Sequence, residues 1–216
     1  MQGVFEERAR KGRKSDRTRA RLMDAAADAF ARHGIEAASV NAIAQAAEVS
    51  NGTFYNHFRD KDEIATVVAY GIARELARRV DDSMRDLDDA AERTSYGTRQ
   101  FIAVATRVPS WGRVFIRSVW SLPELRREVA SFARADLERG ARDGVFKVEV
   151  DDLLVDLFTS MVVMGVSRVL EGESQADLAS QVAEHQLRML GVSAARAKRV
   201  SHAPIQLLAD VPDSLA

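Results

Sequence analysis

Apolar residues recur along most of the chain at intervals of three and four positions, the spacing of one face of an α-helix. The first such run, residues 16–34, places Leu22 and Phe30 on one face and ends at Gly34, in the position where many helices close with a left-handed glycine. A short second helix is predicted to begin after Ser39, because serine is a good N-cap.

The same periodicity continues to about residue 190, and no segment shows sustained apolar–polar alternation. Asp60 opens a long helix that runs through Leu76. Residues 81–97 are predicted to be a helix end and a loop, and "GVFKVEV" an extended connector. Further helices are predicted over residues 98–107, 109–121, 123–142, 151–171 and 175–190.

The predicted fold is therefore all-α, a three-helix head joined by a long helix to a larger helical domain. Its expected divisions are an arm of basic residues over 1–16, expected to be disordered, the head over 17–62, the larger domain over 63–192 and a C-terminal tail over 193–216.

Composition supports a folded helical protein and narrows its chemistry. The 216 residues are 46% hydrophobic, include only four prolines and contain no cysteine, which excludes disulfides and thiolate sites. The N-terminus has no apolar leader, and no stretch of about 18 residues is apolar and uncharged. We expect a cytoplasmic location.

Charge is distributed unevenly although the formal net charge is only −1. Between Arg8 and Arg21 stand eight basic residues against one acid, Asp16. Such a cluster is typical of nucleic-acid contact, although a disordered solubilising tail is the alternative.

The stretch "NGTFYNHF", residues 51–58, crowds three aromatic residues into a chain that has few. Phe54 and Phe58 lie one helical turn apart and are expected to bury against the head's core. Their neighbours then face outward on the second helix of a helix-turn-helix, which enters the major groove of DNA. Amide, hydroxyl and imidazole groups suit contacts with base edges and phosphates.

The segment "SVNAIAQAAEVSNGTFYNHFRDKDEI" resembles the DNA-binding signature of the TetR family of transcriptional regulators, in agreement over about residues 17–64. The resemblance implies that Ser39 caps the bracing helix and touches a phosphate. It places Thr53, Tyr55, His57 and Lys61 at backbone-contacting or groove-facing positions, and Asn41, Asn51, Gly52 and Asn56 where base readers sit.

Two positions depart from the family pattern. Glu48 stands where the turn most often has glycine, so either this position is helical or the side chain is tolerated at positive φ. Asn41 stands where a basic residue is frequent, so the bases read here cannot be inferred from relatives.

The rest of the chain resembles the family's ligand-binding and dimerisation domain in architecture only. The helices over 151–171 and 175–190 are apolar around much of their circumference, which suits pairing with a second copy, although a central helix of a monomer is the alternative. A two-fold dimer would bind a palindromic operator.

A pocket for a small, apolar or aromatic effector is expected at the centre of this domain. The candidate lining residues, each of which equally suits an ordinary core, are Phe101, Trp111, Phe115, Trp120, Phe158 and Met161, with Val104, Phe132 and Met164 near them.

An enzyme is the first rival interpretation. The four histidines are scattered, and no phosphate loop, nucleophile elbow or metal-ligand spacing occurs, so no catalytic residue, cofactor or metal is expected. A DNA-binding or architectural protein without a ligand is the second rival. The preferred hypothesis is a homodimeric repressor that a small molecule releases from its operator.

Overall fold

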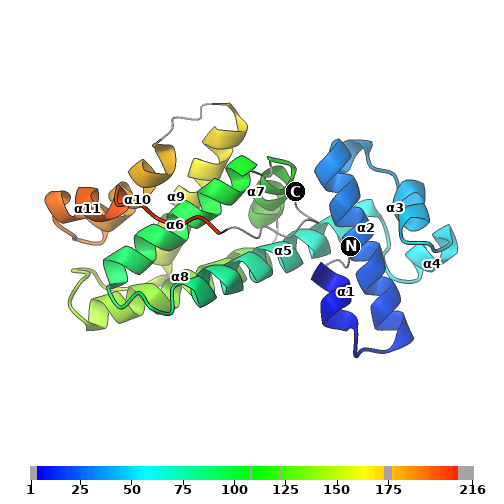
Figure 1. The fold of residues 1–216 in the computed structure, drawn as a ribbon, viewed down its shortest axis with the longest axis horizontal. Coiled ribbons are helices and arrows are strands. Elements are labelled where there is room, and N and C mark those ends of the chain that lie inside the picture. The colour runs from blue at the N-terminus through cyan, green and yellow to red at the C-terminus, as the bar shows by residue number, and fades with distance from the viewer. Residues whose placement is uncertain (1–3, 108, 122, 173–176, 209–216) are drawn as a thin grey trace.

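The computed structural model describes residues 4–107, 109–121, 123–172 and 177–208, and within these ranges every regular element is a helix (Figure 1). This confirms the all-α prediction. The elements are α1 Val4–Ala9, α2 Lys14–Ala37, α3 Val40–Ala46, α4 Asn51–Tyr55, α5 Lys61–Ser83, α6 Ala90–Arg107, α7 Pro109–Ser121, α8 Pro123–Arg142, α9 Asp152–Leu170, α10 Leu178–Met189 and α11 Ala194–Ser201.

Helices α1 to α4 form a compact head at one end of an elongated molecule, and α5 leads from it into the larger domain (Figure 1). Leu22 and Phe30 of α2, Ile43 of α3 and Phe54 of α4 are buried together at the centre of the head. The periodic residues of the sequence thus form the core, as their spacing predicts.

Two backbone positions fix the turns of the head. Gly34 has φ 78° and ψ 162°, a conformation nearly restricted to glycine, and the regular part of α2 ends there. Glu48, between α3 and α4, has φ 54°, so the left-handed alternative holds for this position and the helical one does not. A left-handed conformation at a residue other than glycine costs about 1–2 kcal/mol.

Residues 4–9 correct the expectation of a disordered basic arm, because they form α1, which packs against α2. The ring of Phe5 is buried against Gly71 of α5, where a Cβ atom would lie 2.3 Å from Phe5 Cε1. The Asp24 carboxylate accepts hydrogen bonds from the backbone N–H groups of Phe5 and Glu6 at 3.1 and 2.9 Å. The arm's first turn is thereby docked on two helices.

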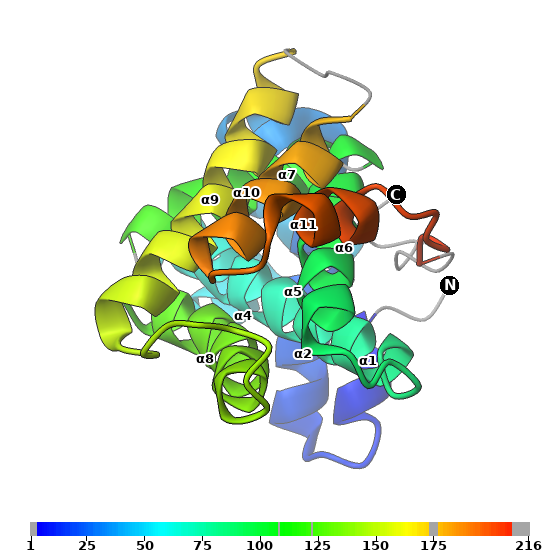
Figure 2. The same cartoon turned by 90° about the vertical axis from the view of Figure 1, so that its left-hand side faces the viewer.

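The larger domain consists of α6 to α11, which are grouped around the part of α5 that lies away from the head (Figures 1 and 2). One apolar cluster runs from the head along α5 to Ile102, Phe115 and Val166. A second cluster, which includes Leu137, Phe146 and Leu187, fills the end remote from the head.

Helix α6 begins at Ala90, eight residues before the predicted start. Ala90 and Ala91 are buried, and Asp89 accepts hydrogen bonds from the backbone N–H groups of Ala91 and Glu92 at 3.0 Å each. The loop between α5 and α6 is therefore shorter than predicted, because the capped first turn of α6 packs into the second cluster.

The tail also contains structure that was expected only in part. Helix α11 packs on α10 and α6, and residues 203–208 then lie along α6. Gln100 holds this segment from both sides, since its amide donates to the Gln206 carbonyl at 2.8 Å and its carbonyl accepts from the Leu208 N–H at 3.1 Å.

Helix α9 has a large exposed apolar stripe. Leu153, Leu157 and Met164 are 66, 50 and 58% exposed, respectively, and their spacing places them on one side of the helix. Of the helices within the described ranges, α9 alone is long and apolar enough to span a membrane by length and composition. A core helix of a soluble protein passes the same test, and α9 packs on α6, α7, α8 and α10.

Candidate DNA-binding surface and ligand pocket

The five-residue helix α4 is fixed from both ends. Ser50 is its N-cap, and its hydroxyl accepts a hydrogen bond from the Thr53 N–H at 3.1 Å. Phe54 and Phe58 are buried with their ring centroids 5.8 Å apart, and the guanidinium of Arg19 lies 4.7 Å from the centroid of Phe58. These contacts set the angle at which α4 stands on the head.

The remaining side chains of this stretch face away from the core. Tyr55 is 58% exposed, with its ring edge-on to Phe54 at 5.4 Å. Asn51, Gly52 and Asn56 are exposed as well. Thr53 and His57, at half-buried positions, border this surface.

Helix α3 contributes to the same surface. The Asn51 amide donates to the Asn41 side-chain oxygen at 3.3 Å, so the two candidate base readers lie side by side across the turn. Ser39 is exposed and caps α3 by accepting from the Ala42 N–H at 3.1 Å. Helices α3 and α4 lie at the end of the molecule remote from α9 (Figure 1), so the exposed amide and hydroxyl groups of Ser39, Asn41, Asn51 and Asn56 belong to that end.

The structure gives Lys61 a contact that its sequence position did not indicate. Its ammonium group donates to the backbone carbonyls of Glu36 and Ala38, each at 2.9 Å, and so ties the start of α5 to the end of α2. An ammonium has three protons, so one remains for a phosphate. The N–H groups of the first turn of α5 are a further anion site, although Asp60 accepts from the Glu63 N–H at 2.7 Å.

Sequence reasoning overlooked two residues of this region. Ser50 went unrecognised although its spacing to Thr53 is that of an N-cap, and its hydroxyl also lies 3.0 Å from the Thr53 hydroxyl. Arg59 projects into solvent next to the surface, and both its backbone N–H and its guanidinium donate to Glu63, at 2.7 and 3.1 Å. In a capping box the Glu63 side chain would accept from the N–H of the N-cap residue Asp60, but here it accepts from the N–H of the preceding residue, Arg59.

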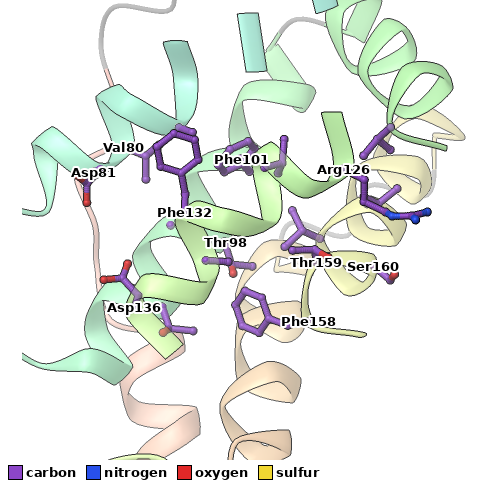
Figure 3. A pocket seen from close by; sticks show the side chains of 18 of the residues that line it. Val80, Asp81, Thr98, Phe101, Arg126, Phe132, Asp136, Phe158, Thr159 and Ser160 are labelled. Carbon is purple, nitrogen blue, oxygen red and sulfur yellow. The ribbon is translucent and has the colours of Figure 1, made fainter. Parts of the chain in front are cut away.

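The larger domain contains a partly open cavity of about 100 Å³ between α5, α6, α7, α8 and α9. Its wall is mainly apolar, and the rings of Phe101 and Phe115 lie 6.5 Å apart. In Figure 3 the rings of Phe101, Phe132 and Phe158 surround the space between Asp136 at one end and Arg126 at the other.

Four of the six candidate lining residues lie on this wall: Phe101, Phe115, Trp120 and Phe158. Among the described residues, Met161 does not line the cavity. The side chain of Trp111 lies outside the described part of the chain, so this candidate stays a prediction. Met164 points to the outer face of α9 instead, as its exposure shows. Phe132 does line the cavity.

Buried polar groups also line the cavity and could not be assigned to it from the sequence. Arg93 is buried and donates from Nε to Asp136 at 2.8 Å, from Nη2 to Asp81 at 3.0 Å and from Nη1 to the Met84 carbonyl at 2.6 Å. This network joins α5, α6 and α8 along one side of the wall. Thr94 lies next in the chain.

Metal and catalytic sites were not expected. The described residues include no group of three or more histidine or acidic side chains that could hold a metal ion. His202 lies between Asp177 and Glu184, with 3.2 Å from its ring nitrogens to each carboxylate, at the outer edge of α10 and α11.

A helix-turn-helix head with an exposed amide- and hydroxyl-rich helix, on an all-helical domain with a cavity, defines a DNA-binding regulator. Family descriptions agree with this class over most of the chain. "Bacterial regulatory proteins, tetR family" matches residues 22–68, and "Tetracyclin repressor-like, C-terminal domain" matches residues 89–203. The chain belongs to the TetR family of transcriptional regulators, as its head motif predicts.

Individual relatives extend over both domains. The HTH-type transcriptional repressor KstR2 of Rhodococcus jostii (strain RHA1) is 31% identical over 143 residues, which cover 62% of this chain and 70% of KstR2. The transcriptional repressor AcnR of Corynebacterium efficiens is 26% identical over 175 residues, 77% of this chain and 89% of AcnR.

Among solved structures, RolR in complex with its ligand resorcinol is 29% identical, with a TM-score of 0.78 over 89% of this chain and 97% of RolR. RolR without ligand gives a TM-score of 0.75 at 28% identity, over 86% of this chain and 97% of RolR. The family is not enzymatic, so the chain is a DNA-binding transcriptional regulator and not an enzyme.

Proposed function

We propose that the protein is a homodimeric repressor that binds a palindromic operator and is released from it by a small aromatic effector in the cavity of its larger domain. The observation that carries the proposal is the division of α4 into a buried Phe54–Phe58 face and an exposed polar face around Tyr55. A repressor of this class acts in the bacterial cytoplasm, where the chromosome is.

The dimer is proposed through α9 and α10. Leu153, Leu157 and Met164 would otherwise leave a continuous apolar stripe in water, an arrangement typical of interaction surfaces. Two-fold pairing of this stripe with its copy buries it on both subunits, as an isologous interface requires. It also directs two heads to successive major grooves, hence the palindrome.

The DNA surface is proposed to comprise three kinds of contact. Base edges are read by Asn41, Asn51, Gly52 and Asn56, and phosphates are held by Ser39, Thr53, Tyr55 and His57. Lys61 contributes its remaining ammonium proton and helix-end N–H groups while it braces α5 on α2. Exposed basic residues of the N-terminal segment, such as Arg10, Lys11 and Arg13, add phosphate contacts nearby.

The effector proposal rests on the cavity and on the relatives. A space of about 100 Å³ is well below the roughly 300–1,000 Å³ of pockets for drug-sized ligands, so it fits one ring better than a long chain. RolR, which shares the fold at 29% identity, binds the one-ring molecule resorcinol. A ligand-independent DNA-binding protein is the alternative, and the cavity counts against it.

The proposal is tested by a gel shift on the DNA that flanks the protein's own coding region. Tyr55→Phe and Asn51→Ala should weaken binding by roughly tenfold each, since each removes a hydrogen bond to DNA. Tyr96→Phe is the matched control, because the Tyr96 hydroxyl donates to the Gln206 carbonyl at 3.3 Å far from the head. Equal affinity of Tyr55→Phe, Asn51→Ala and the parent would refute the assigned surface.

A thermal-shift screen with one-ring aromatic compounds tests the effector. Compounds that raise the melting temperature should also release the DNA in the gel shift, because a ligand shifts the equilibrium only by binding the released state more tightly. Stabilisation by no compound class would favour the ligand-independent alternative.

A further inference from the structure

A segment of the C-terminal tail crosses the outer face of α6, the helix that contributes Phe101 to the cavity wall. Residues 203–208 run along this helix after the end of α11 (Figure 1). Side chains of α6 hold this segment, the strap, by hydrogen bonds to its backbone. The side chains that donate to strap carbonyls are Tyr96, Arg99, Gln100 and Arg107.

Gln100 depends on the strap for both ends of its amide. Its side chain is 0% exposed. The Gln100 Nε2 donates to the Gln206 carbonyl at 2.8 Å, and Oε1 accepts from the Leu208 N–H at 3.1 Å. A buried amide that lost these partners would bear the full cost of desolvation. The strap thus satisfies a polar group that lies in the middle of α6.

The strap contributes more backbone than side chain to this contact. Gln206 and Leu207 are exposed, whereas Leu208 is half-buried against the apolar cluster that includes Phe115. Segments with few buried apolar contacts are the ones that open locally in a folded protein. The strap is therefore a part of the fold that can detach while the domain stays folded.

The opposite face of α6 lines the cavity. Gly97, Thr98 and Phe101 lie on the wall, and Figure 3 shows Thr98 and Phe101 among the side chains around the cavity. Tyr96 and Gln100, four residues apart, share the face toward the strap. A displacement of this part of α6 therefore moves the wall and the ring of Phe101 with it.

The two halves of α6 are anchored differently. Its first turns are fixed from within the domain, by the Asp89 cap and by the ion pairs of Arg93. In the second half, the Arg99, Gln100 and Arg107 side chains donate to the strap, each at 2.8 Å. The half that carries Phe101 thus has polar anchors that are lost when the strap leaves.

We infer that the strap regulates access to the cavity. While it is bound, the strap fixes the second half of α6 as a wall, and when it detaches, this wall moves and widens the way into the cavity. The inference rests on the proposed function for the role of the cavity as the effector site, and it adds the element that controls entry to that site.

The chain contains no cysteine, so a single introduced thiol can report on the wall. Val163→Cys is a change of similar size at a residue of α9 that lines the cavity and is 7% exposed. The rate at which N-ethylmaleimide labels this thiol in the full-length protein, followed by mass spectrometry, measures how often the wall opens.

Two changes detach the strap in different ways. Gln100→Met keeps a side chain of similar length and removes both amide bonds, and deletion of residues 203–216 removes the strap itself. Each should raise the labelling rate of the Val163→Cys thiol about tenfold. Gln206→Ala and deletion of residues 209–216 are the matched controls and should leave the rate unchanged, because Gln206 is held by its carbonyl and Leu208 remains.

A second thiol separates movement of this wall from a general loss of stability. Val68→Cys lies in the first half of α5, is 1% exposed and is not a wall residue. Loss of the strap should leave its labelling rate unchanged. Equal acceleration at both thiols would show that the strap only stabilises the whole fold, and no acceleration at Val163→Cys would show that the wall is independent of the strap; either result overturns the inference.

These rates are measured without effector and without DNA. A protein whose wall opens on loss of the strap, but which binds no operator in the gel shift, contradicts the proposed function and supports the strap. A protein that binds its operator and whose labelling rate ignores the strap contradicts this inference alone.

Discussion

Replacing Lys61 by methionine tests whether this residue braces the head or contacts DNA. Methionine keeps an unbranched stem of similar length and removes the ammonium group, which donates to the Glu36 and Ala38 carbonyls at 2.9 Å each. A hydrogen bond to a charged group contributes about 1.5–3 kcal/mol when buried. Lys61 is half-buried, so we take about 1 kcal/mol for each bond.

The expected loss is therefore about 2 kcal/mol of stability, or a fall of about 4–8 °C in melting temperature for a chain of this size. A calorimetric or dichroism melt measures it. Arg59→Met is the matched control, because it removes a nearby cation whose ion pair with Glu63 is largely exposed. That control should lower the melting temperature by no more than a few degrees.

DNA binding distinguishes the two roles of Lys61. Loss of a phosphate contact lowers the slope of log affinity against log salt by about 0.9, whereas loss of a brace weakens binding at every salt concentration alike. Since the proposed function gives Lys61 both roles, we expect a lower melting temperature together with a slope that falls by about 0.9. An unchanged melting temperature together with a slope lower by about 0.9 would refute the bracing role.

Three further changes have expected outcomes. Leu157→Glu should convert a dimer to a monomer in size-exclusion chromatography with light scattering, whereas Leu207→Glu, at an exposed apolar residue of the tail, should not; two dimers would refute the α9 interface. Glu48→Gly should raise the free energy of unfolding by about 0.5–1 kcal/mol in a denaturant titration, because the relief of the left-handed conformation at φ 54° exceeds the entropy that glycine adds to the unfolded chain. A lower free energy of unfolding would refute this. Phe5→Ala should lower the melting temperature without a change in salt slope, whereas deletion of residues 1–13 should lower both; an unchanged slope after deletion would show that the basic segment does not contact DNA.

The head could be predicted almost completely because its signals are local. Phe54 and Phe58 are four residues apart, Ser39 and Asp60 cap helices within three residues, and Gly34 ends α2 where its pattern stops. Each of these depends on the chain over less than two turns of helix. Short-range geometry of this kind can be read directly from a sequence.

Helix α1 could not be predicted because its stability comes from distant residues. Six residues are too few for a helix that stands alone. Phe5 depends on Gly71, 66 positions away, and the start of α1 depends on Asp24. Burial raises the pKa of the Asp24 carboxyl, while the hydrogen bonds from the Phe5 and Glu6 N–H groups oppose that rise. Nothing in a basic segment indicates such a docking site.

The cavity lies between these cases. The aromatic residues that form its wall were recognisable, but an apolar residue that lines a pocket has the same pattern as one that fills a core, and Met164 turned out to face outward. The ion pair of Arg93 with Asp136 on the same wall depends on packing between α6 and α8. Which polar groups meet there is a property of the folded chain alone.

Two helices connect the cavity to the head, and their geometry limits how an effector can act. Helix α5 lines the cavity with Ala77 and Val80 at one end and is bonded to the end of α2 through Lys61 at the other. Helix α7 lines the cavity with Phe115 and packs on α2.

Because both helices meet α2, a ring that separates α5 from α7 in the cavity must also shift α2, and with it α4. On the proposed function this shift changes the separation of the two heads in the dimer. The Lys61 bonds then serve a second purpose, since a head that is loosely attached to α5 would transmit less of the shift. Lys61→Met should therefore reduce the effect of an effector on operator affinity as well as the affinity itself, and full effector response in that variant would show that α7 alone carries the coupling.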